Sequence, residues 1–366
     1  MSPPGRMAVP RRTIEGYMPI TQQSLTVLAA ILFLLPRGSV EAQFSASPGT
    51  ISHPTSAGFL APSTSASASH ATGVPELASE QPRFRSRVDL VSLDICVRDS
   101  TGRLLTGLTA SDFLLLENGT PQRISLVMPA GTAPLRAILL IDRSASMFGA
   151  KLERAVEAAG LFGRLLGPDD QLEIIAFNHQ AGRVHAFGDD PARVPAALAS
   201  ITATGGTSLY DALLVAANDL IRARQDALPD TREVVIVLSD GEDTASLVGF
   251  DEALPAVRRS GALVYTISLR EGAEGEWLGA SWPLLALARD TGARALSVPR
   301  LDTLPALYAE IDAEVRHLYR IGYVSNDERR DGQWRTLSVR VLSRDAHVRT
   351  RAGYYAPRQR ITGAKP

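Results

Sequence analysis

The sequence predicts an α/β fold in which a doubly wound, mostly parallel sheet is inserted into a small antiparallel β-sandwich built from the flanking segments. Two observations carry this prediction. In the middle of the chain, short apolar runs alternate with amphipathic helical patterns, which is the order of a parallel sheet covered by helices. On either side, apolar and polar residues alternate, and each flank has too few strands to be stable alone. We therefore expect the two flanks to pair with each other around the middle.

The composition narrows the class of protein. A chain of 366 residues with 45% hydrophobic content can form more than one domain. The net charge of −1 gives no indication of a nucleic-acid partner, so we expect none. The single cysteine, Cys96, cannot form an intramolecular disulfide and suits a small core position. The histidines lack the H-E-x-x-H spacing of a zinc site.

The N-terminal residues have the pattern of a targeting segment followed by a linker. Residues 1–42 combine a basic start, an apolar core too short for a comfortable membrane span, and small residues before a cleavage point. We interpret them as a signal peptide and expect an exported protein, periplasmic, held in the cell envelope or secreted. The alternative is an uncleaved segment that anchors the chain in a membrane. Residues 43–80 are rich in Ser, Ala and Pro and are expected to be a disordered tether.

The two flanks are expected to be antiparallel β segments. The N-terminal one, 81–128, contains Asn118-Gly119 between two apolar runs, the strongest short signal of a hairpin. The C-terminal one, 317–357, has three alternating stretches, at 318–323, 334–341 and 347–355. A short tail, 358–366, follows.

The middle of the chain, 132–312, is expected to form the α/β domain. Strands are expected at 137–141, 171–177, 184–187, 234–238, 263–269 and 293–298. Helices are expected from Lys151, at 192–201, from Ser208, and at 250–259, 283–291 and 304–316.

Three oxygen-bearing side chains follow the apolar run at 137–141. Asp142, Ser144 and Ser146 occupy alternate positions on the turn from that strand into a helix. Ligands of open α/β sheets bind at the carboxyl ends of the strands, and Mg²⁺ prefers oxygen ligands. The pattern therefore indicates a cation site, although Asp and Ser are also common helix caps.

Two later stretches favour the cation site over caps. A glycine-rich turn at 203–211 contains Thr207, and the buried run at 234–238 ends close to Asp240. Both bring an oxygen to the same edge of the expected sheet.

With this order and spacing, the chain resembles the von Willebrand factor type A domain with its metal-ion-dependent adhesion site. The resemblance implies a Rossmann-like fold and five intact site residues, namely Asp142, Ser144, Ser146, Thr207 and Asp240. It implies that hydroxyls touch the metal, that the aspartates act through waters, and that one coordination place stays free for an Asp or Glu of a partner protein. The expected cofactor is Mg²⁺, or another divalent cation such as Mn²⁺ or Ca²⁺.

The sequence is compatible with three functions. The first is a metal-dependent protein-binding module for adhesion or assembly, which is not an enzyme. The second is a metal-assisted hydrolase, although no general base is tied by spacing to the site. The third is a scaffold in which the metal is only structural.

Six residues near the expected site are candidates for a rim that contacts a partner. Packing, loop polarity or, for Gly206, a tight turn is the preferred explanation of these residues, and it accounts for Asn178 and His179 as well as a rim does. They are Met147, Phe148, Asn178, His179, Gly206 and Glu242.

The flanks carry a second resemblance. Stretches such as Leu108-Thr109-Ala110-Ser111-Asp112-Phe113 and the terminal Gly353-Tyr354-Tyr355 are similar to the von Willebrand type A-related proteins of Acidobacteria. This resemblance extends over about 81–356 and implies architecture more than function.

Overall fold

The structure is a computed structural model that describes residues 89–129, 131, 133–228, 230–269, 282–298, 300–342 and 345–358. The predicted signal peptide at 1–42, the linker at 43–80 and nearly all of the tail lie outside the described residues. In the part that is described, no helix is long and apolar enough to cross a membrane.

A six-stranded, mostly parallel sheet forms the centre of the α/β part. Its strands are, in order across the sheet, β10 (Ala295–Ser297), β9 (Leu263–Ser268), β8 (Arg232–Ser239), β5 (Leu135–Asp142), β6 (Gln171–Phe177) and β7 (Ala181–His185). Only β7 runs antiparallel to its neighbour. The strands β6 and β8 flank β5 in parallel, with Asp142 opposite Phe177 and Ile141 opposite Leu238. The carboxyl ends of these three strands therefore meet at one edge of the sheet.

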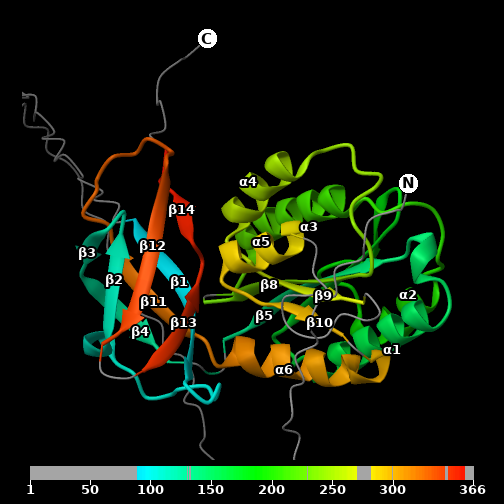
Figure 1. The fold of residues 1–366 in the computed structure, drawn as a ribbon, viewed down its shortest axis with the longest axis horizontal. Coiled ribbons are helices and arrows are strands. Elements are labelled where there is room, and N and C mark those ends of the chain that lie inside the picture. The colour runs from blue at the N-terminus through cyan, green and yellow to red at the C-terminus, as the bar shows by residue number, and fades with distance from the viewer. Residues whose placement is uncertain are drawn as a thin grey trace, which may run out of the picture. The chain divides into compact units, whose positions relative to one another are not determined.

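Helices cover both faces of this sheet, as predicted. In Figure 1, α3 (Leu209–Ala223), α4 (Phe250–Ser260) and α5 (Trp282–Thr291) lie on one face. The helices α1 (Ala150–Leu165) and α6 (Leu304–Arg316) lie on the other, with the short α2 (Val194–Ala199) beside α1. The doubly wound fold class is thereby confirmed.

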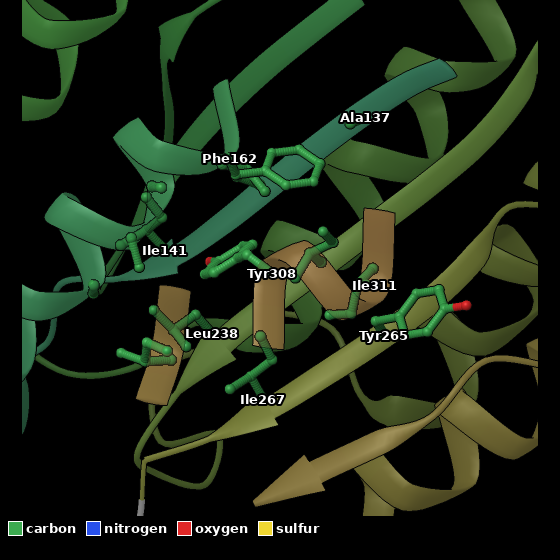
Figure 2. Packing of buried hydrophobic residues seen from close by; sticks show 14 of the residues in the cluster. Ala137, Ile141, Phe162, Leu238, Tyr265, Ile267, Tyr308 and Ile311 are labelled. Atoms are coloured by element: carbon green, nitrogen blue, oxygen red, sulfur yellow. The ribbon is translucent and has the colours of Figure 1, made fainter. Parts of the chain in front are cut away.

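The core explains why β5 is an unbroken apolar run. Every residue of β5 is buried, and successive residues face opposite sides. Ala137 and Ile141 pack toward α1 and α6, as Figure 2 shows, while Ile138 packs toward α3 and α4. On the first side, the rings of Phe162 and Tyr308 lie 5.5 Å apart between centroids.

Two four-stranded antiparallel sheets form the sandwich. The first has the order β13 (Ala346–Thr350), β1 (Leu90–Asp99), β11 (Tyr319–Val324), β4 (Ile124–Met128). The second has the order β14 (Gly353–Tyr355), β12 (Trp334–Val341), β2 (Phe113–Glu117), β3 (Thr120–Gln122). Each sheet combines strands from before and after the α/β part, so the predicted pairing of the flanks is confirmed. The exact domain boundaries stay predictions.

Local turn chemistry accounts for details of the sandwich. Asn118 and Gly119 have φ of 49° and 79°, the positive values that a tight two-residue hairpin between β2 and β3 requires. The stretch expected as one strand at 347–355 is two strands, because β13 and β14 belong to different sheets. Short 3-10 turns complete the fold at Ala110–Asp112, Ala145–Met147, Pro191–Arg193, Arg224–Asp226 and Leu301–Thr303.

A buried carboxylate on α6 joins the sandwich to the α/β part. Glu314 accepts hydrogen bonds from Tyr265 of β9 and Arg349 of β13, each at 2.6 Å, and from Arg98 of β1. Cys96, also on β1, packs in the same core cluster as α6.

Candidate metal centre at the carboxyl edge of the sheet

Asp142 ends β5 at the centre of the carboxyl edge. Its Oδ1 accepts a hydrogen bond from the backbone N–H of Ser144 at 2.8 Å, and its Oδ2 accepts one from the Ser239 hydroxyl at 2.6 Å. The side chain is fully buried, and burial raises the pKa of its carboxyl, an effect that these two hydrogen bonds oppose. The carboxylate is therefore held in one orientation by Ser144 of its own loop and by Ser239 at the end of β8.

Ser144, Ser146 and Asp240 form a chain of hydroxyl and carboxylate oxygens. A 3-10 turn at Ala145–Met147 brings the two serine hydroxyls to 3.0 Å from each other. Ser146 Oγ donates to Asp240 Oδ1 at 2.7 Å across 94 residues of sequence. The structure thus brings together four of the five residues that the sequence predicted.

Thr207, the fifth residue, lies on a third loop at the same edge. Gly205 adopts φ of 77°, and its carbonyl accepts a hydrogen bond from the backbone N–H of Ala145 at 2.9 Å. The Thr207 hydroxyl lies 3.7 Å from where a Cβ on Gly241 would stand, next to Asp240. We call these five residues the oxygen cluster: Asp142, Ser144, Ser146, Thr207 and Asp240.

The loop after β8 is tied to the Thr207 loop by backbone hydrogen bonds. The N–H groups of Thr244 and Ala245 both donate to the Thr207 carbonyl, at 2.9 and 3.0 Å. The Thr244 hydroxyl accepts from the Thr207 N–H at 3.0 Å. Movement of either loop would therefore move the other.

The chemistry of the oxygen cluster fits a hard divalent cation. Its side chains supply two carboxylates and three hydroxyls, which are the donors that Mg²⁺ and Ca²⁺ prefer. A positive charge already contacts the cluster, because Lys151 Nζ donates to Asp240 Oδ2 at 2.5 Å. Within the described ranges, no group of three or more His, Cys, Asp or Glu side chains is arranged to hold a metal ion, so this candidate depends on hydroxyl oxygens.

Three of the rim candidates are exposed. They are Phe148, with 82% of its surface exposed, His179 and Glu242. Gly206 is half-buried, and a Cβ there would stand 3.2 Å from Thr244 and Ala245, so a larger residue would disturb the loop contact.

Two other rim candidates lie inside the fold and do not form a rim. Met147 is fully buried in the core beneath α1, because the 3-10 turn directs it inward. Asn178 is also buried, since its Nδ2 donates to the Thr204 carbonyl and its Oδ1 accepts from the Gln180 N–H. Asn178 therefore stabilises the loop that contains Thr204 and Thr207.

Sequence reasoning missed two residues of this centre. Ser239 orients Asp142, and its place directly before Asp240 was the available signal. Lys151 neutralises Asp240 from the first turn of α1, where a cation is disfavoured by the helix dipole unless an anion compensates it.

Comparison with known proteins identifies a described domain in the middle of the chain. Residues 137–242 match the von Willebrand factor type A domain, which confirms that prediction for the middle of the chain. The matched stretch includes the whole oxygen cluster.

Curated relatives match part of the chain. Inter-alpha-trypsin inhibitor heavy chain H4 of Sus scrofa is 30% identical over 175 residues, covering 46% of this chain and 19% of that protein. An uncharacterized protein of Synechocystis sp. is 33% identical over 113 residues, covering 30% of this chain and 26% of that protein. The chain thus spans about a fifth of the length of the inhibitor heavy chains that it matches.

Solved structures of low sequence identity also align. A von Willebrand factor type A protein from Catenulispora acidiphila is 14% identical with a TM-score of 0.44, covering 76% of both chains. Proximal thread matrix protein 1 from the mussel byssus, with a zinc-occupied MIDAS motif, is 16% identical with a TM-score of 0.40, covering 53% of this chain and 48% of that one.

Proposed function

We propose that this chain, whose residues 137–242 form a von Willebrand factor type A domain, is an exported, metal-dependent protein-binding module for adhesion or assembly. In this proposal the oxygen cluster binds Mg²⁺, or a related ion such as Mn²⁺ or Ca²⁺, and the ion captures an Asp or Glu side chain of a partner protein. The observation that carries the proposal is the meeting of hydroxyl and carboxylate oxygens from three distant loops at one sheet edge.

The five residues of the oxygen cluster would have two different roles. The hydroxyls of Ser144, Ser146 and Thr207 would hold the cation, and the two carboxylates would act through waters, as the resemblance implies. Neutral hydroxyls leave most of the positive charge uncompensated, which favours an acidic group from outside. When bound, the cation would supply a coordination place for that carboxylate.

We propose binding rather than catalysis because both carboxylates of the cluster are already engaged. Asp142 accepts hydrogen bonds from Ser239 and Ser144, and Asp240 accepts from Ser146 and Lys151. Neither is placed as a free general base for a water.

The test is isothermal titration of Mg²⁺ into the full chain, beside the variants Asp142→Ala and Asp240→Ala. We expect saturable binding by the wild type that both variants lose. The matched control is Asp302→Ala, since Asp302 is an exposed carboxylate that pairs with Arg300 on a surface turn. This control should bind like the wild type.

A second measurement separates partner capture from a structural metal. Immobilised peptides that present Glu or Asp should retain the wild type in Mg²⁺ and release it in EDTA. Absence of titratable binding of Mg²⁺, Mn²⁺ and Ca²⁺ would overturn the proposal. Metal binding that raises the melting temperature without any retention would favour the scaffold alternative.

A further inference from the structure

An arginine-lined cavity of about 580 Å³ lies between the sandwich and α4. Its walls come from the start of β1, the connection from β11 to β12, the strand β14 and the helix α4, which lies beside β14 (Figure 1). Six arginines line it: Arg258, Arg259, Arg329, Arg330, Arg335 and Arg351. Only three carboxylates line it with them: Asp89, Asp327 and Glu328. We call it the arginine cavity; it is separate from the oxygen cluster.

Two of these arginines are neutralised by carboxylates outside the cavity lining. Arg258 forms two hydrogen bonds of 2.8 Å to Asp290 and lies over the ring of Trp334. Arg335, buried in the sandwich, lies 3.2 Å from Glu117.

Two more are neutralised by carboxylates of the lining itself. Arg330 pairs with Asp89. Arg329 pairs with Asp327 at 2.7 Å. These four arginines therefore have little charge left for a ligand.

Arg351 is different, because part of its guanidinium has no partner. One terminal nitrogen donates to the Ser92 carbonyl at 2.7 Å, and the group lies over the ring of Tyr354. Its Nε is buried and has no hydrogen-bond partner. No carboxylate in the described ranges forms an ion pair with Arg351, and the charge of Asp94, which acts on it, is paired with Arg320. A buried donor without an acceptor is costly, so an acceptor bound beside Arg351, which lines the cavity, would be favourable.

Arg259 is the second arginine without a carboxylate. It is exposed on α4, lies over the ring of Tyr355, and forms no ion pair with any described residue. Each of the two arginines lies over one of two consecutive tyrosines of β14, Arg351 over Tyr354 and Arg259 over Tyr355. Glu328 is the carboxylate of the lining that would oppose an anion.

We propose that the arginine cavity binds an organic oxyanion, a carboxylate or a phosphate group, through Arg351 and Arg259. The guanidinium group is suited to both, because its planar fork donates two parallel hydrogen bonds to such oxygens. The cavity is large enough for an anionic group with several further atoms attached. This inference does not depend on the metal centre.

The test is isothermal titration of phosphate and of succinate into the full chain, at constant ionic strength and without divalent cations. We expect saturable binding of at least one anion by the wild type. Arg259→Gln should weaken it by about tenfold, the effect of losing one charge-assisted hydrogen bond. Glu328→Gln should strengthen it. Binding of phosphate alone or succinate alone identifies the anion class.

Arg351→Gln should also weaken anion binding, and Arg259→Gln with two control variants keeps the test decisive if Arg351→Gln fails to fold. Arg154→Gln removes an exposed arginine of α1 far along the chain and should bind like the wild type. Asp142→Ala should also bind the anion normally, which separates this site from the oxygen cluster. The proposal is overturned if the folded wild type binds neither anion saturably, or if Arg259→Gln binds as tightly as the wild type.

Discussion

Asp240 illustrates how one carboxylate at the site is shared between two donors. Its Oδ1 accepts from Ser146, and its Oδ2 accepts from Lys151. The Asp240 side chain is only 2% exposed, whereas that of Lys151 is 24% exposed. A buried carboxylate needs a nearby positive charge, and Lys151 provides it from the solvent side. A divalent cation at the oxygen cluster would have to compete with this ammonium group.

At this scale we predict the effect of Lys151→Gln. The substitution should raise the affinity for Mg²⁺ severalfold, since it removes a competing cation beside Asp240. It should also lower the melting temperature measured in EDTA, because Asp240 loses its counter-charge. Titration calorimetry and thermal unfolding measure the two effects. Arg154→Gln, on the same helix, is the control, and weaker Mg²⁺ binding by the Lys151 variant would contradict the prediction.

The elements β6, β7 and α3 meet around a buried pair of acids. Glu173 of β6 and Asp219 of α3 are both buried, and Arg183 of β7 contacts both. Arg183 Nε lies 3.7 Å from Glu173 Oε1 but forms two short hydrogen bonds to Asp219. Burial first, and then the charge of Asp219, raise the pKa of Glu173 to about 8. Burial and the neighbouring charge of Asp219 therefore favour the protonated form of Glu173 in the fold.

The buried carboxyl of Glu173 makes the stability of the fold depend on pH. The pKa of Glu173 rises from 4.5 to about 8 on folding, so between these values the folded chain holds a proton that the unfolded chain has released. The contribution of protonated Glu173 to the free energy of unfolding is complete below pH 4.5 and is lost as the pH rises through about 8. Glu173→Gln should flatten the decline of melting temperature over this range.

Thermal unfolding at a series of pH values measures this slope. Glu157→Gln is the control, because Glu157 is exposed and pairs with Arg154 on α1. A Glu173 variant with the same slope as the wild type would show that this pair does not control the pH dependence.

The whole molecule is held together by strands from both ends of the described chain. Each sheet of the sandwich needs both flanks, so neither flank completes its hydrogen bonding without the other. Glu314 links this sandwich to the α/β part through Arg98, Arg349 and Tyr265. Its side chain is 1% exposed, and its removal would leave Arg349 without its ion-pair partner and Arg98 with only Glu310, 4.0 Å away.

We predict that Glu314→Ala lowers the free energy of unfolding by about 3–5 kcal/mol, the cost of breaking a buried ion pair. Urea denaturation monitored by fluorescence measures this change. Glu310→Ala is the control, since Glu310 is a more exposed carboxylate on the same helix. A loss below about 1 kcal/mol, typical of surface pairs, would show that Glu314 does not hold the two parts together.

Local rules determined much of the fold and of the candidate site. The apolar run of β5, the alternation of the flanks and the Asn118-Gly119 turn follow from periodicity and backbone conformation, which depend on residues close in sequence. The spacing of Asp142, Ser144 and Ser146 after a strand likewise predicted which residues would meet at the edge of the sheet. For these features the sequence was sufficient.

Only the tertiary structure decided the partners of side chains that are distant in sequence. It placed Met147 and Asn178 inside the fold, joined Lys151 to Asp240, buried Glu173 beside Asp219, and left Arg351 Nε without a partner. Burial and partner choice depend on how whole elements pack, and a pattern of residue types carries no information about which charges a neighbouring element will bring. Hence the residues of the oxygen cluster were predicted from the sequence. The contact of Lys151 with this cluster and the arginine cavity became visible only in the tertiary structure.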